Sequence, residues 1–459
     1  MIRRTVIPVV AALAATLLVA SPAGATISSP TRISSSNLRI QDIAVGAGGG
    51  RTAIVMDGYD PKPNPDEFEV LARLGTATSL GSAQRLAGGG YVTGVAVGAD
   101  GTAVAGWTQA INGRRTWRVA IARPGKSFGS ARTLGDPGVR GGDLAVTPRG
   151  RIVAIWRTRS SDHSVRVAIA PPGGWFGGAK TIGVARQDQP LVASGPDGTV
   201  VATWLDTPPA PQPPPAPAPT DRTAEIEATT LASSASAFAA PATLASFTYW
   251  GSGPALSTGP GGVVVSWPQP MESAGTMRKL VRLLPHATFE SAFDLLDLTA
   301  SAPIAGIGLE NTLALGLPSD LTIRALWQDA KTKNGESDQL TSSVVKTSSR
   351  PAAGEHGLFS AAKTLSTAGW LAGGPEAGAL TDRTIAAWGE AAKTKPSRLR
   401  IAIRSNANWT VASPLKAPNL DTNSVSLAAG SRHVPVVWIQ HPDAKRPGGQ
   451  AYLATYRPS

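Results

Sequence analysis

The stretch Pro196-Asp-Gly-Thr-Val-Val-Ala-Thr-Trp204 contains a short turn, a β-rich run and a tryptophan, in that order. Close copies are Ala99-Asp-Gly-Thr-Ala-Val-Ala-Gly-Trp107 and Pro148-Arg-Gly-Arg-Ile-Val-Ala-Ile-Trp156. Glycine in a tight turn, followed by Val, Ile and Thr, predicts a hairpin that leads into a strand. Phrases of this kind end at tryptophans spaced 48 to 63 residues apart, namely Trp107, Trp156, Trp204, Trp267, Trp327, Trp388 and Trp438. Met56 precedes Trp107 by 51 residues and heads the series, so we expect eight units.

Each of the first seven units also contains an aromatic or aliphatic residue that is followed six positions later by Leu or Ile. These pairs are Leu80/Leu86, Phe128/Leu134, Phe176/Ile182, Phe238/Leu244, Phe289/Leu295, Phe359/Leu365 and Trp409/Leu415. With an apolar run before the turn and an alternating run such as Arg118–Ala122 after the tryptophan, each unit supplies four short strands, called A to D here. Four strands in a repeat of roughly 40–50 residues are typical of a β-propeller blade. We therefore expect an all-β fold: one β-propeller of eight four-stranded blades, or of seven if Met56 does not head a unit.

The N-terminal part of the repeat predicts how the ring closes. Ile27 and Ile33 have the six-residue spacing, and Ile33 precedes Met56 by 23 residues, as Leu365 precedes Trp388. We expect residues 26–35 to form the outer strand of the last blade. Such closure removes the open sheet edges that would otherwise invite aggregation.

The first 25 residues have the pattern of a secretory signal peptide. Arg3-Arg4 precedes an apolar stretch over 6–20 and the small residues Ala23-Gly-Ala25. We expect cleavage after Ala25 and a mature, secreted (extracytoplasmic) propeller domain over 26–459, with no membrane span. The chain has no cysteine, which excludes disulfides and thiolate metal ligands.

The formal net charge of +12 favours acidic partners such as cell-wall polymers or acidic polysaccharide. The alternative is that arginine merely replaces lysine in a composition rich in Ala, Gly, Pro and Arg. We expect a polysaccharide, a cell-wall polymer or a protein as partner, no nucleic acid, and a monomer.

Insertions mark the face of the propeller that is free to vary, which is the face formed by the B–C and D–A loops. The proline-rich loop over 207–220 lies inside unit four and predicts a projecting polyproline arm, either a ligand for a proline-binding groove or a solvated spacer. Basic residues recur in the B–C loops of units two, six, seven and eight, at Arg114, Arg115, Lys331, Lys333, Lys393, Lys395, Lys445 and Arg446. They predict a positive rim, unless these lysines and arginines simply occupy exposed hairpins.

Acidic and amide side chains recur at two positions that could carry chemistry. Two residues after the tryptophan stand Gln109, Asp206, Gln269, Asp329, Glu390 and Gln440. At the expected channel mouth, near the start of strand A, stand Asp42, Asp143 and Glu376. Paired carboxylates about 5–10 Å apart could hydrolyse glycosides, although polar strand ends are the ordinary interpretation.

No other catalytic signature is present. The five histidines lack a metal-ligand spacing, and no Gly-x-Ser-x-Gly elbow precedes a helix. We therefore predict no catalytic residue, no metal and no cofactor. Trp117, Trp250 and Trp370 lie off the repeat pattern and are the tryptophans to consider for sugar stacking.

The repeat resembles a family of exported bacterial β-propeller proteins whose units read Asp-Gly-Thr-Ala-Val-x-x-Trp and then Phe-Gly-x-x-x-x-Leu. The matching segments are Asp100–Trp107, Asp197–Trp204, Phe128–Leu134 and Phe176–Ile182. The resemblance implies a propeller and no particular activity.

A fainter likeness is to the sialidase superfamily, whose Asp-box reads Ser-x-Asp-x-Gly-x-Thr-Trp. That box is not met, because Asp100 and Gly101 are adjacent and Trp107 comes six residues after the glycine. A sialidase also implies an arginine triad and a Tyr/Glu nucleophile pair, which these residues do not supply.

The sequence supports three functional hypotheses. The first is a non-catalytic exported propeller that binds an anionic polymer, a glycan or a protein through its B–C/D–A face, using the basic residues named above and the proline-rich arm. Asp42, Asp143 and Glu376 are further candidate ligand-binding residues of this hypothesis. The second is a polysaccharide hydrolase or lyase with carboxylates at the channel mouth. The third is a structural scaffold of the cell envelope.

Overall fold

The computed structural model describes most of the chain after residue 25. The described residues are 26–61, 68–135, 139, 141–186, 188–207, 223–248, 253–271, 275–284, 288–289, 293–296, 313–332, 340–350, 359–392, 395–405, 408–420, 424–429, 433–441 and 448–457. Their regular structure is β throughout, in antiparallel sheets. No helix in this part of the chain is long and apolar enough to cross a membrane. The predicted signal peptide over 1–25 and most of the proline-rich loop over 207–220 lie outside the described residues.

The first four units each form one antiparallel sheet, with strands joined in chain order from A to D. Unit one contains β3 (Arg39–Gly48), β4 (Arg51–Tyr59), β5 (Phe68–Thr76), β6 (Ser79–Leu80) and β7 (Gln84–Gly88). Unit two contains β8 (Tyr91–Val97), β9 (Ala103–Ile111), β10 (Arg114–Ala122) and β11 (Arg132–Thr133). Unit three contains β12 (Gly142–Val146), β13 (Ile152–Arg157), β14 (Ser164–Ala170) and β15 (Lys180–Val184). Unit four contains β16 (Leu191–Ser194), β17 (Val200–Asp206), β18 (Thr223–Leu231) and β19 (Ala242–Thr248).

The remaining sheets follow the same order, with short additional strands. Unit five contains β20 (Ala255–Gly259), β21 (Gly262–Met271), β22 (Gly275–Leu284), β23 (Thr288–Phe289) and β24 (Phe293–Leu296). Unit six contains β25 (Ala314–Gly316), β26 (Ile323–Thr332), β27 (Leu340–Arg350) and β28 (Lys363–Thr364). Unit seven contains β29 (Leu371–Ala372), β30 (Glu376–Ala379), β31 (Arg383–Ala392), β32 (Lys395–Ser405), β33 (Asn408–Val411) and β34 (Leu415–Lys416). Unit eight contains β35 (Ser426–Leu427), β36 (Val434–Gln440) and β37 (Gln450–Arg457), joined by β1 (Thr26–Ile27) and β2 (Thr31–Arg32).

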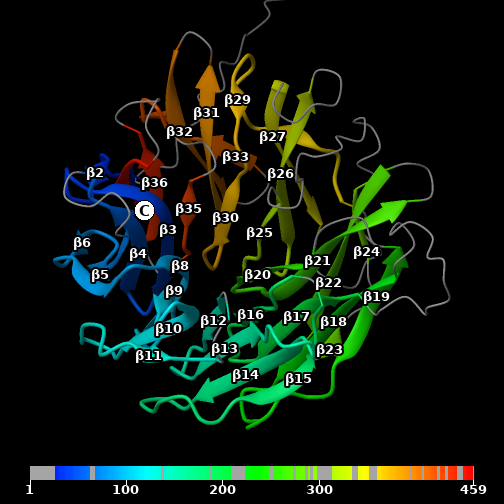
Figure 1. Ribbon diagram of the computed structural model, residues 1–459. Coiled ribbons are helices and arrows are strands. Elements are labelled where there is room, and N and C mark those ends of the chain that lie inside the picture. The colour runs from blue at the N-terminus through cyan, green and yellow to red at the C-terminus, as the bar shows by residue number, and fades with distance from the viewer. Residues whose placement is uncertain are drawn as a thin grey trace, which may run out of the picture.

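The A strands of successive units touch one another. Strand β3 contacts β8, β8 contacts β12, and the series continues through β16, β20, β25, β30 and β35. Strand β35 in turn contacts β3. In Figure 1 the sheets accordingly follow one another in chain order around the centre of the molecule. The A strands line that centre, and the D strands lie outside.

The B strands form the core because a neighbouring sheet covers each of their faces. Strands β13 and β17 are buried over almost their whole length, without the alternation expected of a strand with one wet face. The repeated aromatic side chains are buried here, and Trp107, Trp267, Trp388 and Trp438 have no exposed surface at all. Burial of each such side chain stabilises the fold by roughly 1.5–3 kcal/mol. The hydrophobic periodicity of the repeat therefore encodes the interfaces between units.

The Asp-Gly-Thr phrase builds the turn between strands A and B. Asp100 accepts hydrogen bonds from the backbone nitrogen of Thr102 at 2.9 Å and from its hydroxyl at 2.7 Å. Asp197 makes the same two bonds to Thr199, at 2.9 and 2.7 Å. Gly101, between Asp100 and Thr102, has φ of 83°, a conformation that glycine adopts without the penalty of a Cβ atom. The repeated Asp-Gly-Thr phrase is therefore explained by the turn that it forms, without a catalytic or binding role.

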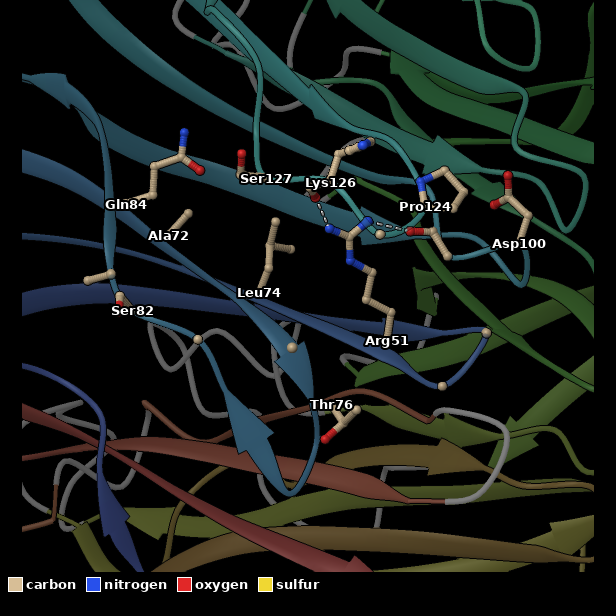
Figure 2. A pocket seen from close by; sticks show the side chains of 17 residues that line it. Arg51, Ala72, Leu74, Thr76, Ser82, Gln84, Asp100, Pro124, Lys126 and Ser127 are labelled. Carbon is tan, nitrogen blue, oxygen red and sulfur yellow. Dashed lines mark hydrogen bonds between the residues drawn. The ribbon is translucent and has the colours of Figure 1, made fainter.

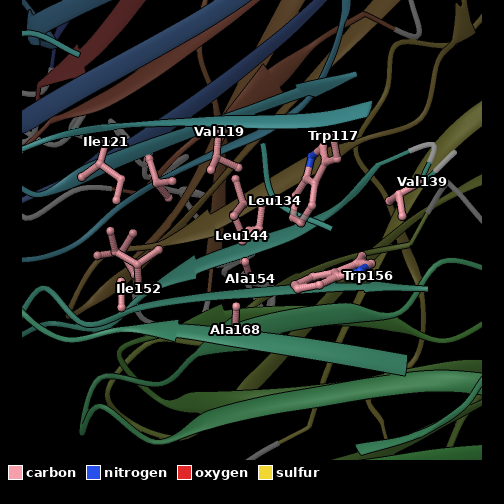
Figure 3. Packing of buried hydrophobic residues seen from close by; sticks show 13 residues of the cluster. Trp117, Val119, Ile121, Leu134, Val139, Leu144, Ile152, Ala154, Trp156 and Ala168 are labelled. Carbon is pink, nitrogen blue, oxygen red and sulfur yellow. The ribbon is translucent and has the colours of Figure 1, made fainter. Parts of the chain in front are cut away.

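One hydrophobic cluster shows how neighbouring units pack (Figure 3). Trp117 and Leu134 of unit two meet Leu144 and Trp156 of unit three, with the two indole rings 5.9 Å apart. The indole nitrogen of Trp117 donates to the Thr93 hydroxyl at 3.0 Å. Trp117, which the sequence placed among the possible sugar-stacking tryptophans, is therefore a core residue.

The N-terminal strands pair with the last sheet. Thr26 lies opposite Arg457 and Thr31 opposite Leu453, both in antiparallel register with β37. Ile33, 3% exposed, packs with Val437 and Leu453, and its nitrogen donates to the Ala451 carbonyl at 2.9 Å. Residues 26–34 thus occupy the outer edge of sheet eight, where the other units carry strand D.

Candidate functional site

A cluster of charged and aromatic side chains lies at the B–C end of unit seven, and we call it the Trp370 site. It consists of Trp370 in the D–A connection before β29, Glu390 on β31, and Lys395, Arg398 and Arg400 on β32. Strands β31 and β32 pair so that Glu390 faces Arg398 in register. The site therefore follows directly from the hairpin that the repeat predicts.

Glu390 holds the site together from a fully buried position. Its Oε1 accepts from the Thr367 nitrogen at 2.9 Å and from the Trp388 indole at 3.2 Å. Its Oε2 accepts from Arg398, at 2.9 Å from Nε and 2.7 Å from Nη2. A buried carboxylate with this many donors is fixed in place, and it orients the guanidinium it binds.

Arg398 in turn lies against Trp370. Its guanidinium carbon is 3.7 Å from the ring centroid, and its Nη2 also donates to the Thr367 hydroxyl at 2.7 Å. The Lys395 ammonium is 5.9 Å from the same centroid, and its side chain is exposed. Arg400 Nε lies 3.9 Å from Glu390, and burial lowers the pKa of its guanidinium. Two arginines thus contact one carboxylate and Lys395 lies over the same tryptophan, which leaves an excess of positive charge beside a half-buried ring.

Three of the other polar residues that follow the tryptophans, Asp206, Asp329 and Gln109, also have structural partners. Asp206 forms an ion pair with Arg186, whose Nη1 donates to Oδ1 at 2.8 Å and to Oδ2 at 2.7 Å, and Asp329 pairs with Lys346. Gln109 donates to the Gly88 carbonyl at 2.8 Å. The side chain of Gln269 lies outside the described residues. These residues tie strand B to its neighbours, so the hypothesis that they are catalytic carboxylates gains no support here.

The three carboxyl groups predicted at the channel mouth lie on three different A strands, Asp42 on β3, Asp143 on β12 and Glu376 on β30. Burial raises the pKa of Asp143 to about 6, although hydrogen bonds from the Val192 and Leu144 nitrogens, both at 2.8 Å, oppose the shift. Burial also raises the pKa of Glu376 to about 7. Glu376 is nevertheless solvent-exposed at the start of β30, and the protein atoms near its carboxyl group, rather than another charge, cause the shift. No other carboxylate contributes to either pKa shift.

Asp57 is a buried acid that the sequence did not single out. It lies opposite Asp42 in the ladder of β3 and β4 and has no exposed surface. Burial raises its pKa to about 7, and the nearby charge of Asp42 contributes in the same direction. Its Oδ2 accepts from the Val92 nitrogen of unit two at 2.7 Å, and its Oδ1 accepts from the Asp42 nitrogen at 3.3 Å. Asp143 and Asp57 thus both reach the A strand of the next unit, which is a structural role.

Among the described residues, no group of three or more His, Asp or Glu side chains is arranged to hold a metal ion.

The predicted basic rim is described in part. Arg114 and Arg115 are exposed at the start of β10, after a turn in which Asn112 and Gly113 have φ of 50° and 73°. Asn-Gly is the sequence preferred in such two-residue hairpins. Lys331 lies in β26 opposite Ser342, but its side chain is not described. Lys333, Lys393, Lys445 and Arg446 lie outside the described residues, as does Trp250.

A cavity of about 830 Å³ opens between units one and two, at the end of the sheets that carries the A–B turns (Figure 2). Arg51 projects into it from the start of β4, and Ala72 and Leu74 line it from β5. The turns around Gly101 and Gly125 of unit two complete its wall. The loop pattern had directed attention to the B–C/D–A face, so the sequence did not predict this cavity.

No family model matches the chain, and no curated protein sequence matches it. Solved structures resemble it at low identity. A polysaccharide lyase, Uly1, is 8% identical with a TM-score of 0.49, over 78% of this chain and 88% of that one. An ulvan lyase of a new polysaccharide lyase family is 10% identical with a TM-score of 0.47, over 82% and 96%. An acylaminoacyl peptidase is 11% identical with a TM-score of 0.45, over 80% and 51%.

Proposed function

We propose that this chain is an exported, eight-bladed β-propeller that binds an anionic polymer through its B–C/D–A face and catalyses no reaction on it. The architecture is supported by the unbroken circle of contacts among the A strands, from β3 through β35 and back to β3. The pairing of Thr26 with Arg457 supports closure by the N-terminal strand. The B strand of unit one supports eight blades rather than seven, because its residue Met56 is buried like the tryptophans of the other units.

The observation that carries the binding proposal is the charge at the Trp370 site. Lys395, Arg398 and Arg400 outnumber the single carboxylate of Glu390, and Trp370 offers an aromatic surface beside them. Arg398 is already fixed by Glu390 and Thr367, so little side-chain entropy remains to be lost when an anionic group binds. Arg114 and Arg115 extend the exposed positive charge to unit two, on hairpins of the same B–C type.

The experiment is a binding titration of residues 26–459 with a soluble polyuronate, a sulfated polysaccharide and a neutral glucan, at low and physiological salt. We expect salt-sensitive binding to the two anionic polymers and none to the glucan, because exposed charges are screened within about 10 Å at 0.1 M salt. The variants are Lys395→Gln and Arg114→Gln/Arg115→Gln, and each should weaken binding. Lys180→Gln, on the exposed outer strand β15 of unit three, is the matched control. Equal affinity of all variants would contradict the proposal.

The raised pKa of Glu376 favours a second candidate, a polysaccharide hydrolase or lyase. A carboxyl group that titrates near pH 7 is suited to general acid–base catalysis. This candidate predicts turnover of a polysaccharide with a rate that titrates near pH 7 and is lost in Glu376→Gln. The binding proposal predicts no turnover in either protein.

Export rests on the pattern of residues 1–25. It is tested by expressing the full chain in a bacterium and measuring the mass of the protein recovered outside the cytoplasm. A mature N-terminus at Thr26 would support export, and an intact chain retained in the cytoplasm would contradict it.

A further inference from the structure

We propose that the cavity between units one and two binds a small hydroxylated carboxylic acid, of the size of one or two sugar rings, with its carboxylate at Arg51. The cavity lies at the end of the sheets that carries the A–B turns, whereas the Trp370 site lies at the B–C end. This second site therefore goes beyond the proposed polymer binding and does not depend on it.

Arg51 is the cation that selects an acid. Its Nη1 donates to the carbonyls of Gly101 at 2.8 Å and Arg123 at 2.6 Å, and its Nη2 donates to the Lys126 carbonyl. These carbonyls orient the guanidinium but do not neutralise it, and none of the described carboxylates forms an ion pair with it. Burial lowers the pKa of Arg51, and no opposing charge raises it. A carboxylate in the cavity would supply the missing charge and could bind the guanidinium's remaining N–H groups.

The other charges around the cavity also favour an anion. Asp100 is the acidic residue in the lining, and both of its oxygens already accept hydrogen bonds from Thr102. Lys126 adds a second cation to the wall. The cavity therefore carries a positive excess, and its one carboxylate is committed to a turn.

Comparison with the next interface shows why the cavity is open here. The Gly81 nitrogen donates to the Leu74 carbonyl, and the Gly129 nitrogen donates to the Ile121 carbonyl. These equivalent bonds align the C–D turns of units one and two. The same alignment places Gln84 at the position of Arg132. At the interface of units two and three, Arg132 stacks on Trp175 at 4.7 Å and occupies the corresponding place.

The residue at the position of Trp175 is Ser127 in the cavity. Gln84 lines the cavity and binds the Phe128 backbone, donating to its carbonyl at 2.8 Å and accepting from its nitrogen at 3.1 Å. The interface of units one and two thus has Ser127 and Gln84 where the next interface has Trp175 and Arg132. It lacks the stacked pair that occupies this place between units two and three.

The size and surface of the cavity suit a ring that carries hydroxyl groups. About 830 Å³ lies within the range of roughly 300–1,000 Å³ that is usual for small-molecule sites. Ala72 and Leu74 form an apolar wall for the C–H face of a ring. The hydroxyls of Thr76, Ser82 and Ser127 lie in the lining where ring hydroxyls would need partners.

The experiment is isothermal titration of residues 26–459 with glucuronate and digalacturonate, against glucose and inorganic sulfate. Ser127→Trp refills the cavity with the side chain of the next interface and leaves Arg51 untouched. Arg51→Gln removes the charge. Arg151→Gln is the matched control, because Arg151 makes the equivalent bond to the Ala235 carbonyl at 2.9 Å outside the cavity. Melting temperature is measured for each variant, so that loss of folding is separated from loss of binding.

We expect the uronates to bind and glucose not to bind. Ser127→Trp and Arg51→Gln should each weaken binding tenfold or more, which is about the effect of losing one charge-assisted hydrogen bond. Arg151→Gln should bind the uronates as the wild type does. Equal binding of glucose, equal binding of sulfate alone, or undiminished uronate binding by a folded Ser127→Trp variant would overturn the proposal. Polymer binding in Ser127→Trp should be unchanged, which keeps the outcome separate from that of the Trp370 site.

Discussion

The guanidinium carbon of Arg398 lies over the ring of Trp370, 3.7 Å from its centroid, and Glu390 holds the guanidinium there. A stacked arginine that is also bound to a buried carboxylate cannot turn away from the aromatic ring without losing both contacts. The pair is therefore a preorganised surface in the free protein. In unit seven the same carboxylate also accepts the indole N–H of the repeated tryptophan, Trp388, so the surface is connected to the core.

Removing the charge of Glu390 should destabilise the fold strongly. Glu390→Gln leaves Arg398 and Arg400 without their counter-charge, and breaking a buried ion pair costs about 3–5 kcal/mol. Chemical denaturation measures the change in the free energy of unfolding. Asp382→Asn is the control, because Asp382 is 64% exposed in its pair with Arg383 and such surface pairs contribute only about 0–1 kcal/mol. Similar losses in the two variants would contradict the structural role given to Glu390.

Removing the Trp370 ring should weaken polymer binding and leave stability largely intact. Trp370→Ala takes away the aromatic surface, while Glu390 still holds Arg398, so we expect about a tenfold weaker affinity for an anionic polymer. Trp175→Ala is the matched control, because Trp175 is also half-buried and stacked on an arginine, but on the C–D turn of unit three. If both variants lose affinity alike, the Trp370 site is not the binding surface.

Asp57 should make stability fall as pH rises between about 4 and 7. Its pKa is raised to about 7 in the folded protein, so the folded state holds a proton that the unfolded state has released in that interval. The contribution is present in full below the unfolded pKa and is lost as pH rises through 7, with a size on the order of 4 kcal/mol.

The check is denaturant unfolding of Asp57→Asn and wild type at several pH values from 4 to 8. The asparagine oxygen can still accept from the Val92 nitrogen, so we expect a flatter pH profile and greater relative stability at pH 8. An identical pH slope in the two proteins would show that Asp57 does not titrate in this range.

The N-terminal strand should contribute measurably to the stability of sheet eight. Ile33→Ala removes a buried side chain between Val437 and Leu453 and should cost about 2–5 kcal/mol. Thr31→Ala, at an exposed position of the same segment, should cost little. Deletion of residues 26–35 should lower the melting temperature and expose the edge of β37, with association visible in light scattering. A deletion protein that is monomeric and melts like the wild type would contradict the closure proposal.

The sequence predicted the strands better than the partners of polar side chains. The tryptophans mark the B strands because a strand buried on both faces requires a continuous apolar run, which is visible in the sequence. The Asp-Gly-Thr turn is also determined by neighbouring residues. The partners of Glu390 and Asp206 could not be read in the same way, because they depend on which cross-strand or neighbouring residue each carboxylate meets. The Glu390–Arg398 pair could have been predicted, because the two residues lie on the two strands of one hairpin and its register places them opposite each other.

Two features of the site had weaker signals. Asp57 stands inside an otherwise apolar B strand, where a buried carboxyl is unusual, but nothing local shows that it reaches Val92. The cavity at Arg51 becomes visible in the sequence only when Gln84 and Ser127 are aligned with Arg132 and Trp175, because it arises from what two adjacent repeats lack.

The pairing of β1 and β2 with β37 has a consequence for the order in which the molecule can form. The Thr455 nitrogen donates to the Ser28 hydroxyl across a separation of 427 residues. Contacts of such long range form slowly, since a long loop must close before they are made. Sheet eight must therefore wait until nearly the whole chain has left the ribosome, whereas units one to seven each assemble from a single continuous segment. A nascent chain arrested before β37 would hold up to seven sheets and an unpaired first strand, and chaperones and proteases would meet that intermediate.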